Sequence, residues 1–563
     1  MLALTASAQP AIRSSKGVLN ASSYATGIAP GSWFVVFGTG MGPATISVYS
    51  GAAPYPTQLS GTSVKFTPAG GGTALDARMW YTLAGQVAGM LPSSATPGNY
   101  NVTVTYNQAT SAPYSVTVVA RNFGYATQAQ NGAGPAQATY GGLDLNRFTS
   151  GTLAYNGNNW TLKPAHIGDT LVLWGTGLGA DSASDLNGGT SGDMTAAAGV
   201  KVNVGGVQIT PSYAGRSSGS PGLDQVNFVL PATVQTGCFA PLSVTAGGQT
   251  SNLGSIAIAD SGKTACNGGN WTEAQLRKLD LGGTLTVGSL SLSKLTTKLS
   301  VSGFSFDSTT ETASGSFSKY TVDTIGTTNY SLWQQGVCTV FSRTGTSAQI
   351  ATGVPPTPLD AGSQLTLNGP GATNMAIPHP AAGDKTYSLT LYSSGFGGFG
   401  GSGTPTLAQG TYTIAGAGGI DIGAFTSSLA FPGSFVWTNI DTTGPVIPRS
   451  VGMPINWTGG GSGTVTISGF SSVAVGQSGS DTVYNSVGFT CLAPASALTF
   501  TVPSSVLLQL PAASSDPTSN SFGYLTVAAL SNSVFTAPMT AGGSIDQGFF
   551  SGLIGSAKTV GWN

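Results

Sequence analysis

Two stretches of the sequence occur twice, in the same order and with nearly the same spacing, and this repeat constrains the fold more than any other feature. The copies are residues 28–42 with residues 165–179, and residues 86–92 with residues 225–231. Because both stretches recur at almost the same offset, the unit between them is duplicated as a whole. The repeat therefore predicts two domains of one fold, at residues 17–121 and 161–266.

Each copy has the pattern of β-strands bounded by turns. Residues 34–37 and 171–174 are runs of large apolar side chains, and each is followed by Gly-Thr-Gly-x-Gly. Glycines can adopt the positive φ angles needed where the chain leaves a sheet. In the second stretch a strand that begins with Gln ends at Pro, which cannot continue a central ladder. About 100 residues with such strands predict an immunoglobulin-like β-sandwich for each copy.

The motifs of the two copies resemble those of a known domain. They are residues 18–24, 29–32, 37–43 and 221–227, followed by the cysteines at 238 and 266. In this order they are similar to the uncharacterised Solibacter-type domain of secreted acidobacterial proteins, over about residues 17–266. The resemblance implies a secreted tandem of immunoglobulin-like (IPT/TIG-like) sandwiches with no established activity. The first copy departs from the pattern, since it lacks the cysteines and has Ala-Gly-Gln where the second has Leu-Asp-Gln.

The rest of the chain also has a β-rich pattern, so we predict an all-β protein. Residues 122–160 are expected to form an ordered connector strap between the sandwiches. Thr272 and Gln275 make a capping box, which predicts one short helix at residues 272–280. Residues 267–563 should form a further sandwich-like region of one or two domains, with a break near 430–450. Its strands are predicted at residues 283–292, 387–392, 410–414, 463–467, 498–502 and 524–530.

Charge is scarce, which excludes several classes of partner. Only 7% of residues are charged and the net charge is −1, whereas about 25% is usual in globular proteins. Such a chain has no field to attract nucleic acid, and little repulsion between copies opposes self-association. The hydrophobic fraction of 40% provides enough apolar surface for folded domains. No stretch of 18 apolar residues occurs, so no membrane span is predicted.

The N-terminus and the cysteines predict secretion to the extracellular space or the cell surface. Residues 1–9 resemble the end of a signal peptide cleaved after Ala8, although a basic region is missing. We therefore treat residues 1–16 as a signal-peptide remnant and tether. Four cysteines suit an oxidising compartment. We pair Cys238 with Cys266, which flank the strands of one domain, and Cys338 with Cys491 by elimination.

The motifs that could carry chemistry lack the context that their chemistry needs. The GxGxxG at residues 395–400 and the GxSxG at residues 215–219 are not followed by a helical pattern. The chain has two histidines. His166 lies at a repeat position that alanine fills in the first copy, and His379 lies between two prolines. We therefore predict no enzyme, no catalytic residue and no cofactor.

One cluster of oxygen ligands is a candidate for calcium. It consists of Asp181, Asp185, Asn187 and Asp193. The spacing matches no EF-hand and lacks the closing glutamate. An Asx-rich loop is the favoured interpretation, so no metal is predicted.

Two features suggest a partner. The tripeptide Asn-Trp-Thr occurs three times, and its tryptophans, Trp160, Trp271 and Trp457, would either stack on sugar rings or cap a sandwich core. The C-terminal residues Phe549, Phe550, Leu553, Ile554 and Trp562 form an apolar segment that could dock on a neighbouring subunit.

We therefore predict a secreted, non-catalytic structural or adhesive protein, and one specific version of this prediction is polymerisation through exposed strand edges. A carbohydrate-binding module is the alternative, and an enzyme of unfamiliar design in the C-terminal region is the second alternative. The predicted partner is accordingly either the protein itself or an extracellular polysaccharide.

Overall fold

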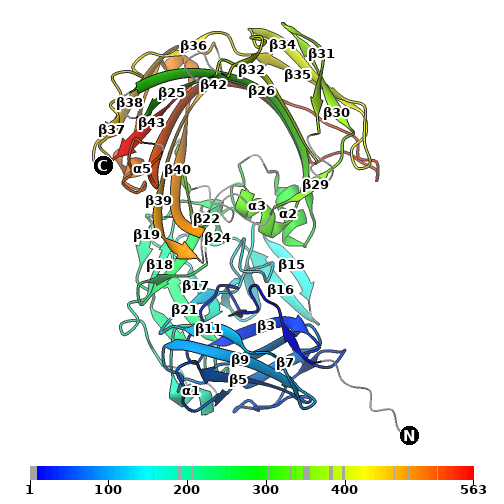
Figure 1. Cartoon of the computed structure of the whole chain (residues 1–563), viewed down its shortest axis with the longest axis vertical. Helices are drawn as coiled ribbons and strands as arrows, with labels where there is room; N and C mark the ends of the chain where they lie inside the picture. The colour runs from blue at the N-terminus through cyan, green and yellow to red at the C-terminus, as the bar shows by residue number, and fades with distance from the viewer. Residues whose placement is uncertain are drawn as a thin grey trace. The chain divides into compact units, whose positions relative to one another are not determined.

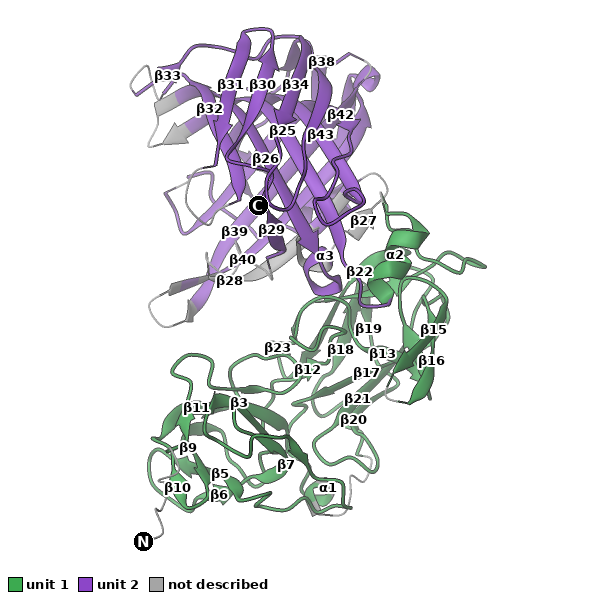
Figure 2. Ribbon diagram, turned by 90° about the vertical axis from the view of Figure 1, so that its right-hand side faces the viewer, with its two compact units in different colours: residues 1–280 green, residues 281–563 purple. Residues whose placement is uncertain are grey.

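The computed structural model divides the chain into two compact units, Met1–Asp280 and Leu281–Asn563 (Figure 2). It describes residues 9–563 except 156, 187–191, 206, 253, 270, 302–303, 329–332, 336–337, 347–354, 380–384, 396–399, 462, 479–480 and 517. The predicted signal-peptide residues 1–8 and Asn187 of the calcium candidate lie outside the described residues. The fold is all-β with tandem sandwiches, as predicted.

The first sandwich of unit 1 consists of two antiparallel sheets. One contains β1 (Ala11–Ile12), β2 (Val18–Asn20), β3 (Trp33–Thr39), β4 (Ser47–Val48), β7 (Arg78–Leu83) and β8 (Gln86–Met90). The other contains β5 (Thr62–Pro68), β6 (Leu75–Asp76), β9 (Gly98–Tyr106), β10 (Ala109–Thr110) and β11 (Tyr114–Val118). Along β3, Phe34 and Val36 point into the core between the sheets. Because side chains alternate along a strand, Trp33 and Val35 face the other way.

The second sandwich repeats this arrangement and adds strands to it. Its larger sheet contains β12 (Gly124–Tyr125), β13 (Ala138–Gly141), β14 (Asp144–Asn146), β15 (Gly151–Tyr155), β16 (Asn158–Lys163), β17 (Thr170–Thr176), β20 (Tyr213–Arg216) and β21 (Asp224–Val229). Facing it are β18 (Lys201–Val204), β19 (Val207–Ile209), β22 (Gly237–Ala246), β23 (Gln249–Thr250) and β24 (Gly254–Ile258). The pairing of β3 with β8 recurs here as β17 with β21. The expected connector strap at residues 122–160 instead supplies β12 to β15 and part of β16 to this larger sheet.

The predicted helix is present as α2 (Glu273–Asp280). Its capping box forms as expected, since Thr272 N–H donates to Gln275 Oε1 at 3.0 Å and Gln275 N–H donates to Thr272 Oγ1 at 3.3 Å. At the end of the helix the Asp280 carboxylate accepts hydrogen bonds from the backbone N–H groups of Phe148 and Thr149. The prediction of a single helix was wrong. Further short helices are α1 (Ser182–Leu186), α3 (Val322–Thr328), α5 (Ser504–Leu507) and the 3-10 helix η1 (Ala495–Ala497).

Unit 2 is built on one 12-stranded sheet that curls strongly (Figure 1). It contains β25 (Leu285–Val301), β26 (Phe304–Tyr320), β27 (Trp333–Gln335), β28 (Cys338–Thr346), β29 (Thr357–Leu359), β32 (Thr386–Ser393), β33 (Ser402–Gly403), β37 (Val446–Ile447), β39 (Thr464–Ser478), β40 (Asp481–Pro494), β42 (Ser521–Val534) and β43 (Gln547–Trp562). Two smaller sheets cover its outer face. They are β30 (Gln364–Gly369), β31 (Ala372–Pro378), β34 (Gly410–Gly416) and β35 (Phe425–Phe431), and β36 (Phe435–Trp437), β38 (Met453–Gly459) and β41 (Thr499–Val502).

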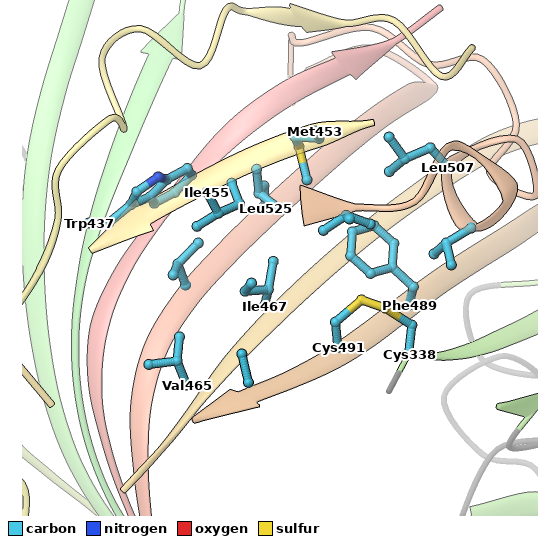
Figure 3. Close-up of a cluster of buried hydrophobic side chains, with 14 of the residues drawn as sticks. Cys338, Trp437, Met453, Ile455, Val465, Ile467, Phe489, Cys491, Leu507 and Leu525 are labelled. Carbon is cyan, nitrogen blue, oxygen red and sulfur yellow. A yellow bond between two sulfur atoms is a disulfide. The ribbon is translucent and has the colours of Figure 1, made fainter. Parts of the chain in front are cut away.

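Each outer sheet encloses its own hydrophobic core against the curled sheet. Figure 3 shows the core under β36, β38 and β41, where Trp437 and Ile455 pack toward Ile467 and Leu525 of the curled sheet. The chain passes from one outer sheet to the other between β35 and β36, close to the predicted break at 430–450. The curled sheet is continuous across both cores, so the region is one compact unit rather than two separate domains.

Charged side chains of the long strands point to the outer, covered face of the curled sheet. In β25, β26, β32, β39, β42 and β43 the charged residues are Lys294, Lys298, Asp307, Glu311, Lys319 and Lys558. Lys294 pairs with the fully buried Glu311 at 2.8 Å, and Lys558 donates to the carbonyl of Ile440 at 3.0 Å. Serines and threonines alternate with these charged residues along the strands and point to the inner face. Ser291, for example, forms a hydrogen bond with Ser314.

Candidate functional site

A cavity of about 480 Å³ lies in unit 1 between the two sandwiches. The first sandwich lines it with Ala21, Ser22, Tyr24, Trp33, Val35, Tyr55, Trp80 and Tyr81, and the second with Ala126, Thr127, Gln130, Gln137, Gly175, Ser220, Pro221 and Leu223. These sixteen residues are aromatic, aliphatic, amide or hydroxyl residues, and none carries a charge. A partly apolar concavity of this size with a few polar groups is typical of a small-molecule or oligosaccharide site.

The wall from the first sandwich is a cluster of aromatic rings. The Trp33 ring lies 5.2 Å from the Tyr55 ring in an edge-to-face arrangement and 5.0 Å from the Trp80 ring. Tyr49 extends the cluster, with its ring 5.4 Å from that of Tyr55. Trp33 is buried, whereas Trp80 is 39% exposed. The cavity therefore has a fixed aromatic base and an accessible indole beside it.

A β-bulge explains why two neighbouring aromatic residues both face this cavity. The register between β7 and β8 shifts between Met79 and Tyr81, so that Trp80 is the extra residue of β7. Met79 and Thr82 point into the core on either side of it and are fully buried. A regular strand would send Trp80 and Tyr81 to opposite faces, but a bulge redirects a side chain.

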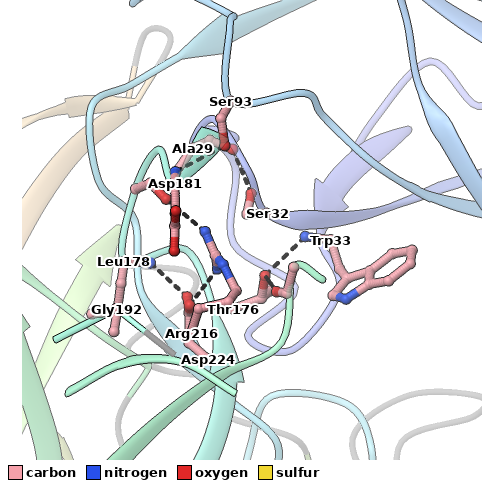
Figure 4. A network of polar contacts seen from close by, with 12 residues as sticks. Ala29, Ser32, Trp33, Ser93, Thr176, Leu178, Asp181, Gly192, Arg216 and Asp224 are labelled. Carbon is pink, nitrogen blue, oxygen red and sulfur yellow. Dashed lines mark hydrogen bonds and ion pairs between the residues drawn. The ribbon is translucent and has the colours of Figure 1, made fainter. Parts of the chain in front are cut away.

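The second sandwich contributes the turn between β20 and β21, which packs directly on Trp33. Thr176 Oγ1 accepts a hydrogen bond from the Trp33 backbone N–H at 2.8 Å and donates to the Gly222 carbonyl at 2.7 Å (Figure 4). Gly222 has a φ of +80°, and a Cβ there would lie 2.8 Å from Trp33 Nε1. Only glycine therefore allows this turn to approach the indole so closely.

A buried ion pair holds the base of the same turn. Arg216 and Asp224, at its two ends, are both fully buried and form an ion pair. Asp224 also accepts from Leu178 N–H at 2.8 Å, and Arg216 donates to the Gly179 carbonyl at 2.8 Å. Burial raises the pKa of the Asp224 carboxyl to about 6, against the lowering effect of Arg216.

The serine at residue 93 links the first sandwich to α1 of the second. Ser93 donates its backbone N–H to Asp185 Oδ2 at 2.6 Å and its hydroxyl to Asp185 Oδ1 at 2.9 Å. The Ser93 hydroxyl in turn accepts from Asp181 N–H at 2.9 Å (Figure 4). The two walls of the cavity are therefore joined by polar contacts as well as by packing.

Two polar side chains of the cavity are oriented by partners behind them. Gln137 Oε1 accepts a hydrogen bond from Arg147 Nη2 at 2.9 Å. The Tyr81 hydroxyl accepts from Gln86 Nε2, and burial raises the pKa of Tyr81 to about 12. Both groups are thus fixed in direction and uncharged at neutral pH.

Two residues of the cavity have left-handed backbone conformations. Tyr24 has a φ of +57° and Gln130 has a φ of +54°. A residue with a Cβ in this region costs about 1–2 kcal/mol. Strain of this kind often accompanies residues that are held for binding, which supports the choice of this cavity as the candidate site.

The tryptophans singled out in the sequence lie elsewhere. Trp457 lies in β38 and is 1% exposed, and its Nε1 donates to the Ala495 carbonyl at 2.8 Å, so the prediction of a sugar-binding role was wrong for this residue. Trp160 is partly buried in β16 opposite Leu153, and Trp271 is partly buried just before α2. For these two the role stays a prediction.

Two acidic residues of the calcium candidate, Asp185 and Asp193, serve as hydrogen-bond acceptors. Asp185 binds Ser93 through both oxygens, and Asp193 Oδ1 accepts from the Thr195 N–H and hydroxyl. Among the described residues, no group of three His, Cys, Asp or Glu side chains is placed to hold a metal ion.

The C-terminal apolar segment is already used within its own unit. It forms β43, which pairs with β42 on one side and runs parallel to β25 on the other. Phe550 and Trp562 are buried, and Trp562 Nε1 donates to the Phe470 carbonyl at 2.9 Å. In this structure the segment is not free to dock on a neighbour.

Both predicted disulfides are confirmed. Cys238 in β22 bonds to Cys266, and Cys338 in β28 bonds to Cys491 directly opposite it in β40.

Trp33 and Trp80 are not among the residues predicted from the sequence, although each left a signal there. Aligning the repeats places Trp33 opposite Thr170, at a strand position that faces away from the core. The adjacent pair Trp80-Tyr81 interrupts the alternation of a strand whose neighbours Met79 and Thr82 are buried.

No protein-family model matches the chain, and no curated protein sequence matches it. A solved structure of SGBP-B from the mixed-linkage glucan utilization locus of Bacteroides ovatus, in complex with a mixed-linkage heptasaccharide, is 11% identical, covers 89% of this chain and 88% of its own, and has a TM-score of 0.11.

Two further solved structures are similar at the same level. Domains 5–6 of the S-layer protein SbsC are 14% identical over 45% of this chain and 99% of theirs, with a TM-score of 0.16. Immunoglobulin domains 1–4 of Sidekick-1 are 10% identical over 92% of this chain and 94% of theirs, with a TM-score of 0.11. In the described part of this chain, none of the helices has the length and apolar character needed to cross a membrane.

Proposed function

We propose that the protein is a non-catalytic extracellular adhesin that binds a neutral polysaccharide in the cavity between the two sandwiches of unit 1. The observation that carries the proposal is the combination of clustered aromatic rings at Trp33, Tyr55 and Trp80 with an uncharged polar lining. Sugar rings have apolar faces and hydroxyl edges. An aromatic surface bordered by amides and hydroxyls offers a complementary partner to each.

The absence of charge from the sixteen lining residues favours a neutral glycan as the ligand. An isolated carboxylate or sulfate loses hydration when it enters a cavity, and here no cation of the lining would compensate it. A neutral glycan has no such cost. Binding that depends on stacking and neutral hydrogen bonds also changes little with ionic strength.

Secretion fits this function. Both disulfides are present, and such bonds persist in oxidising compartments. The low charge of the chain also leaves few sites for proteases that cleave at lysine or arginine.

Polymerisation through the C-terminal segment receives less support. Since β43 lies in the middle of the curled sheet of its own unit, deleting residues 545–563 would disrupt the folding of unit 2. Loss of assembly in that truncation would therefore not identify a docking segment.

The test is retention of the full-length protein by polysaccharides, measured by affinity electrophoresis and calorimetry. The panel includes neutral glycans (hydroxyethyl cellulose, xyloglucan, galactomannan, starch) and the anionic polygalacturonate. We expect binding to a neutral glycan and none to polygalacturonate. Trp80→Ala should weaken binding about 30-fold, since buried tryptophan contacts contribute about 2 kcal/mol.

Trp160→Ala and Trp271→Ala are the matched controls. They remove tryptophans of the same unit that do not line the cavity, so binding should stay within about twofold of wild type. Loss of binding in these variants but not in Trp80→Ala would favour the loop tryptophans instead. Absence of binding to every neutral glycan would contradict the proposed function.

A further inference from the structure

A buried cation lies behind the polar wall of the cavity. The Arg147 side chain is 5% exposed, and its guanidinium donates to the Asn146 carbonyl at 2.7 Å and to Gln137 Oε1 at 2.9 Å. Burial lowers the pKa of Arg147 to about 10, so the group remains charged at neutral pH.

This contact fixes the direction of the Gln137 amide. A guanidinium has five N–H donors and no acceptor, so the amide must turn its oxygen toward Arg147. Flipping the amide would place its NH₂ group against a buried cation. The Nε2 of Gln137, which can only donate, therefore points away from Arg147 and is left for another partner.

Tyr81, the second oriented group of the cavity, also presents a hydrogen-bond donor. Because the Tyr81 oxygen accepts from Gln86, the phenolic hydrogen points elsewhere and is available as a donor. The raised pKa of Tyr81 keeps this hydrogen in place at neutral pH. Two polar groups of the cavity, contributed by the two sandwiches, are thus both set as donors.

We propose that Gln137 is a specificity-determining residue of the cavity, that it recognises an acceptor oxygen of a neutral glycan through Nε2, and that Arg147 is its positioning residue. This inference rests on the proposed function. It predicts that the ligand faces this wall with its ring, glycosidic or hydroxyl oxygens as acceptors.

The decisive variant is Gln137→Glu, which keeps the shape of the side chain and reverses its hydrogen-bonding character. The new carboxylate would pair with the guanidinium of Arg147, so we expect a higher unfolding temperature of unit 1. Its second oxygen would replace the Nε2 donor. We therefore expect the affinity for the neutral glycan that the wild-type protein binds most tightly to fall at least 10-fold. A merely structural role for Gln137 cannot produce these two opposite changes together.

Two further variants complete the experiment. Gln249→Glu makes the same chemical change at an exposed position of unit 1 that does not line the cavity, and affinity should fall less than threefold. Tyr81→Phe removes the other donor without touching Arg147, and should weaken binding about 3- to 10-fold.

The outcomes separate the two proposals. If Gln137→Glu binds as tightly as wild type while Trp80→Ala loses binding, the role of Gln137 is overturned and the proposed function stands. Equal losses in Gln137→Glu and Gln249→Glu also overturn it, because added charge alone would then explain the effect. If the wild type binds no neutral glycan, both proposals fall.

Discussion

Arg216 and Asp224 form a fully buried ion pair across the base of the β20–β21 turn, the turn that packs on Trp33. The burial of the Asp224 carboxylate raises its pKa even though a guanidinium is its direct partner. The desolvation of the carboxylate thus exceeds the attraction that it gains. Desolvation of buried ion pairs commonly offsets their attraction, so the contribution of this pair is expected to lie in fixing the geometry of the turn rather than in added stability.

We predict that breaking the pair is far more costly than removing it. Asp224→Asn leaves a buried guanidinium without a counter-charge and should lower the free energy of unfolding of unit 1 by about 3–5 kcal/mol. The double variant Arg216→Met/Asp224→Leu removes both charges and should stay within about 1–2 kcal/mol of wild type. Calorimetry of the full chain measures both. A double variant as unstable as the single one would show that the ion pair itself stabilises the fold.

The same pair predicts a pH dependence of stability. The pKa of Asp224 is raised from 3.8 to about 6 in the folded protein, so between these values the folded state binds more protons than the unfolded state. The contribution of this group is therefore most favourable below about pH 4 and is lost as pH rises toward 6. Burial also raises the pKa of Asp185 and of Asp280, which act in the same direction.

The measurement is the unfolding temperature of the wild type relative to Arg216→Met/Asp224→Leu at a series of pH values. Taking the difference cancels the contributions of carboxylates that do not interact with this pair, but not that of Asp185, whose pKa Arg216 lowers. We expect the wild type to lose stability relative to the double variant between about pH 4 and pH 6. A relative gain over that interval would mean that Arg216 lowers the pKa of Asp224 more than burial raises it.

Much of the fold could be predicted because its signals are local or repeated. The duplicated stretches gave two sandwiches, the capping box at Thr272 and Gln275 gave α2, and an even number of cysteines gave two disulfides. The length of the long strands of unit 2 was underestimated. The apolar alternation of Leu290 and Leu292 stops where β25 continues with Lys and Thr, because the outer face there holds ion pairs instead of apolar side chains.

The candidate site could not be predicted in the same way, because its residues come from two domains. Trp33 and Trp80 lie on β3 and β7 of one sheet, and Gln137 of the second sandwich joins them only through the packing of the two sandwiches. The tripeptide Asn-Trp-Thr drew attention to Trp457 through local sequence alone. Its alternation within β38 instead places that ring in the core of unit 2.

The close approach of the two sandwiches predicts that Gly31 tolerates no side chain. Its φ is +71°, and a Cβ there would lie 2.6 Å from Ser93 Oγ and 2.8 Å from Arg216 Nη2. Gly31→Ala should therefore destabilise unit 1 by about 2 kcal/mol or more, through backbone strain and displacement of both groups. Gly157→Ala is a matched control, since Gly157 also has positive φ but has open space around it. Equal unfolding temperatures for the two variants would contradict a clash between the sandwiches.

The two disulfides should differ in what they stabilise. Cys338–Cys491 closes a separation of 153 residues within unit 2, and loop entropy assigns about 5 kcal/mol to such a bridge. Cys238–Cys266 closes 28 residues in unit 1 and should contribute about 4 kcal/mol. We expect Cys338→Ala/Cys491→Ala to lower the unfolding temperature of unit 2 and to leave glycan binding by unit 1 unchanged.

The complementary variant, Cys238→Ala/Cys266→Ala, should lower the unfolding temperature of unit 1 only. Because Cys266 N–H bonds the Phe148 carbonyl near α2, the loss should loosen the second sandwich at the end that carries this helix. Calorimetry with and without the bound glycan separates these effects, since a ligand stabilises only the unit that binds it. A glycan-dependent rise in the unfolding temperature of unit 2 would place the binding site outside the cavity at Trp33.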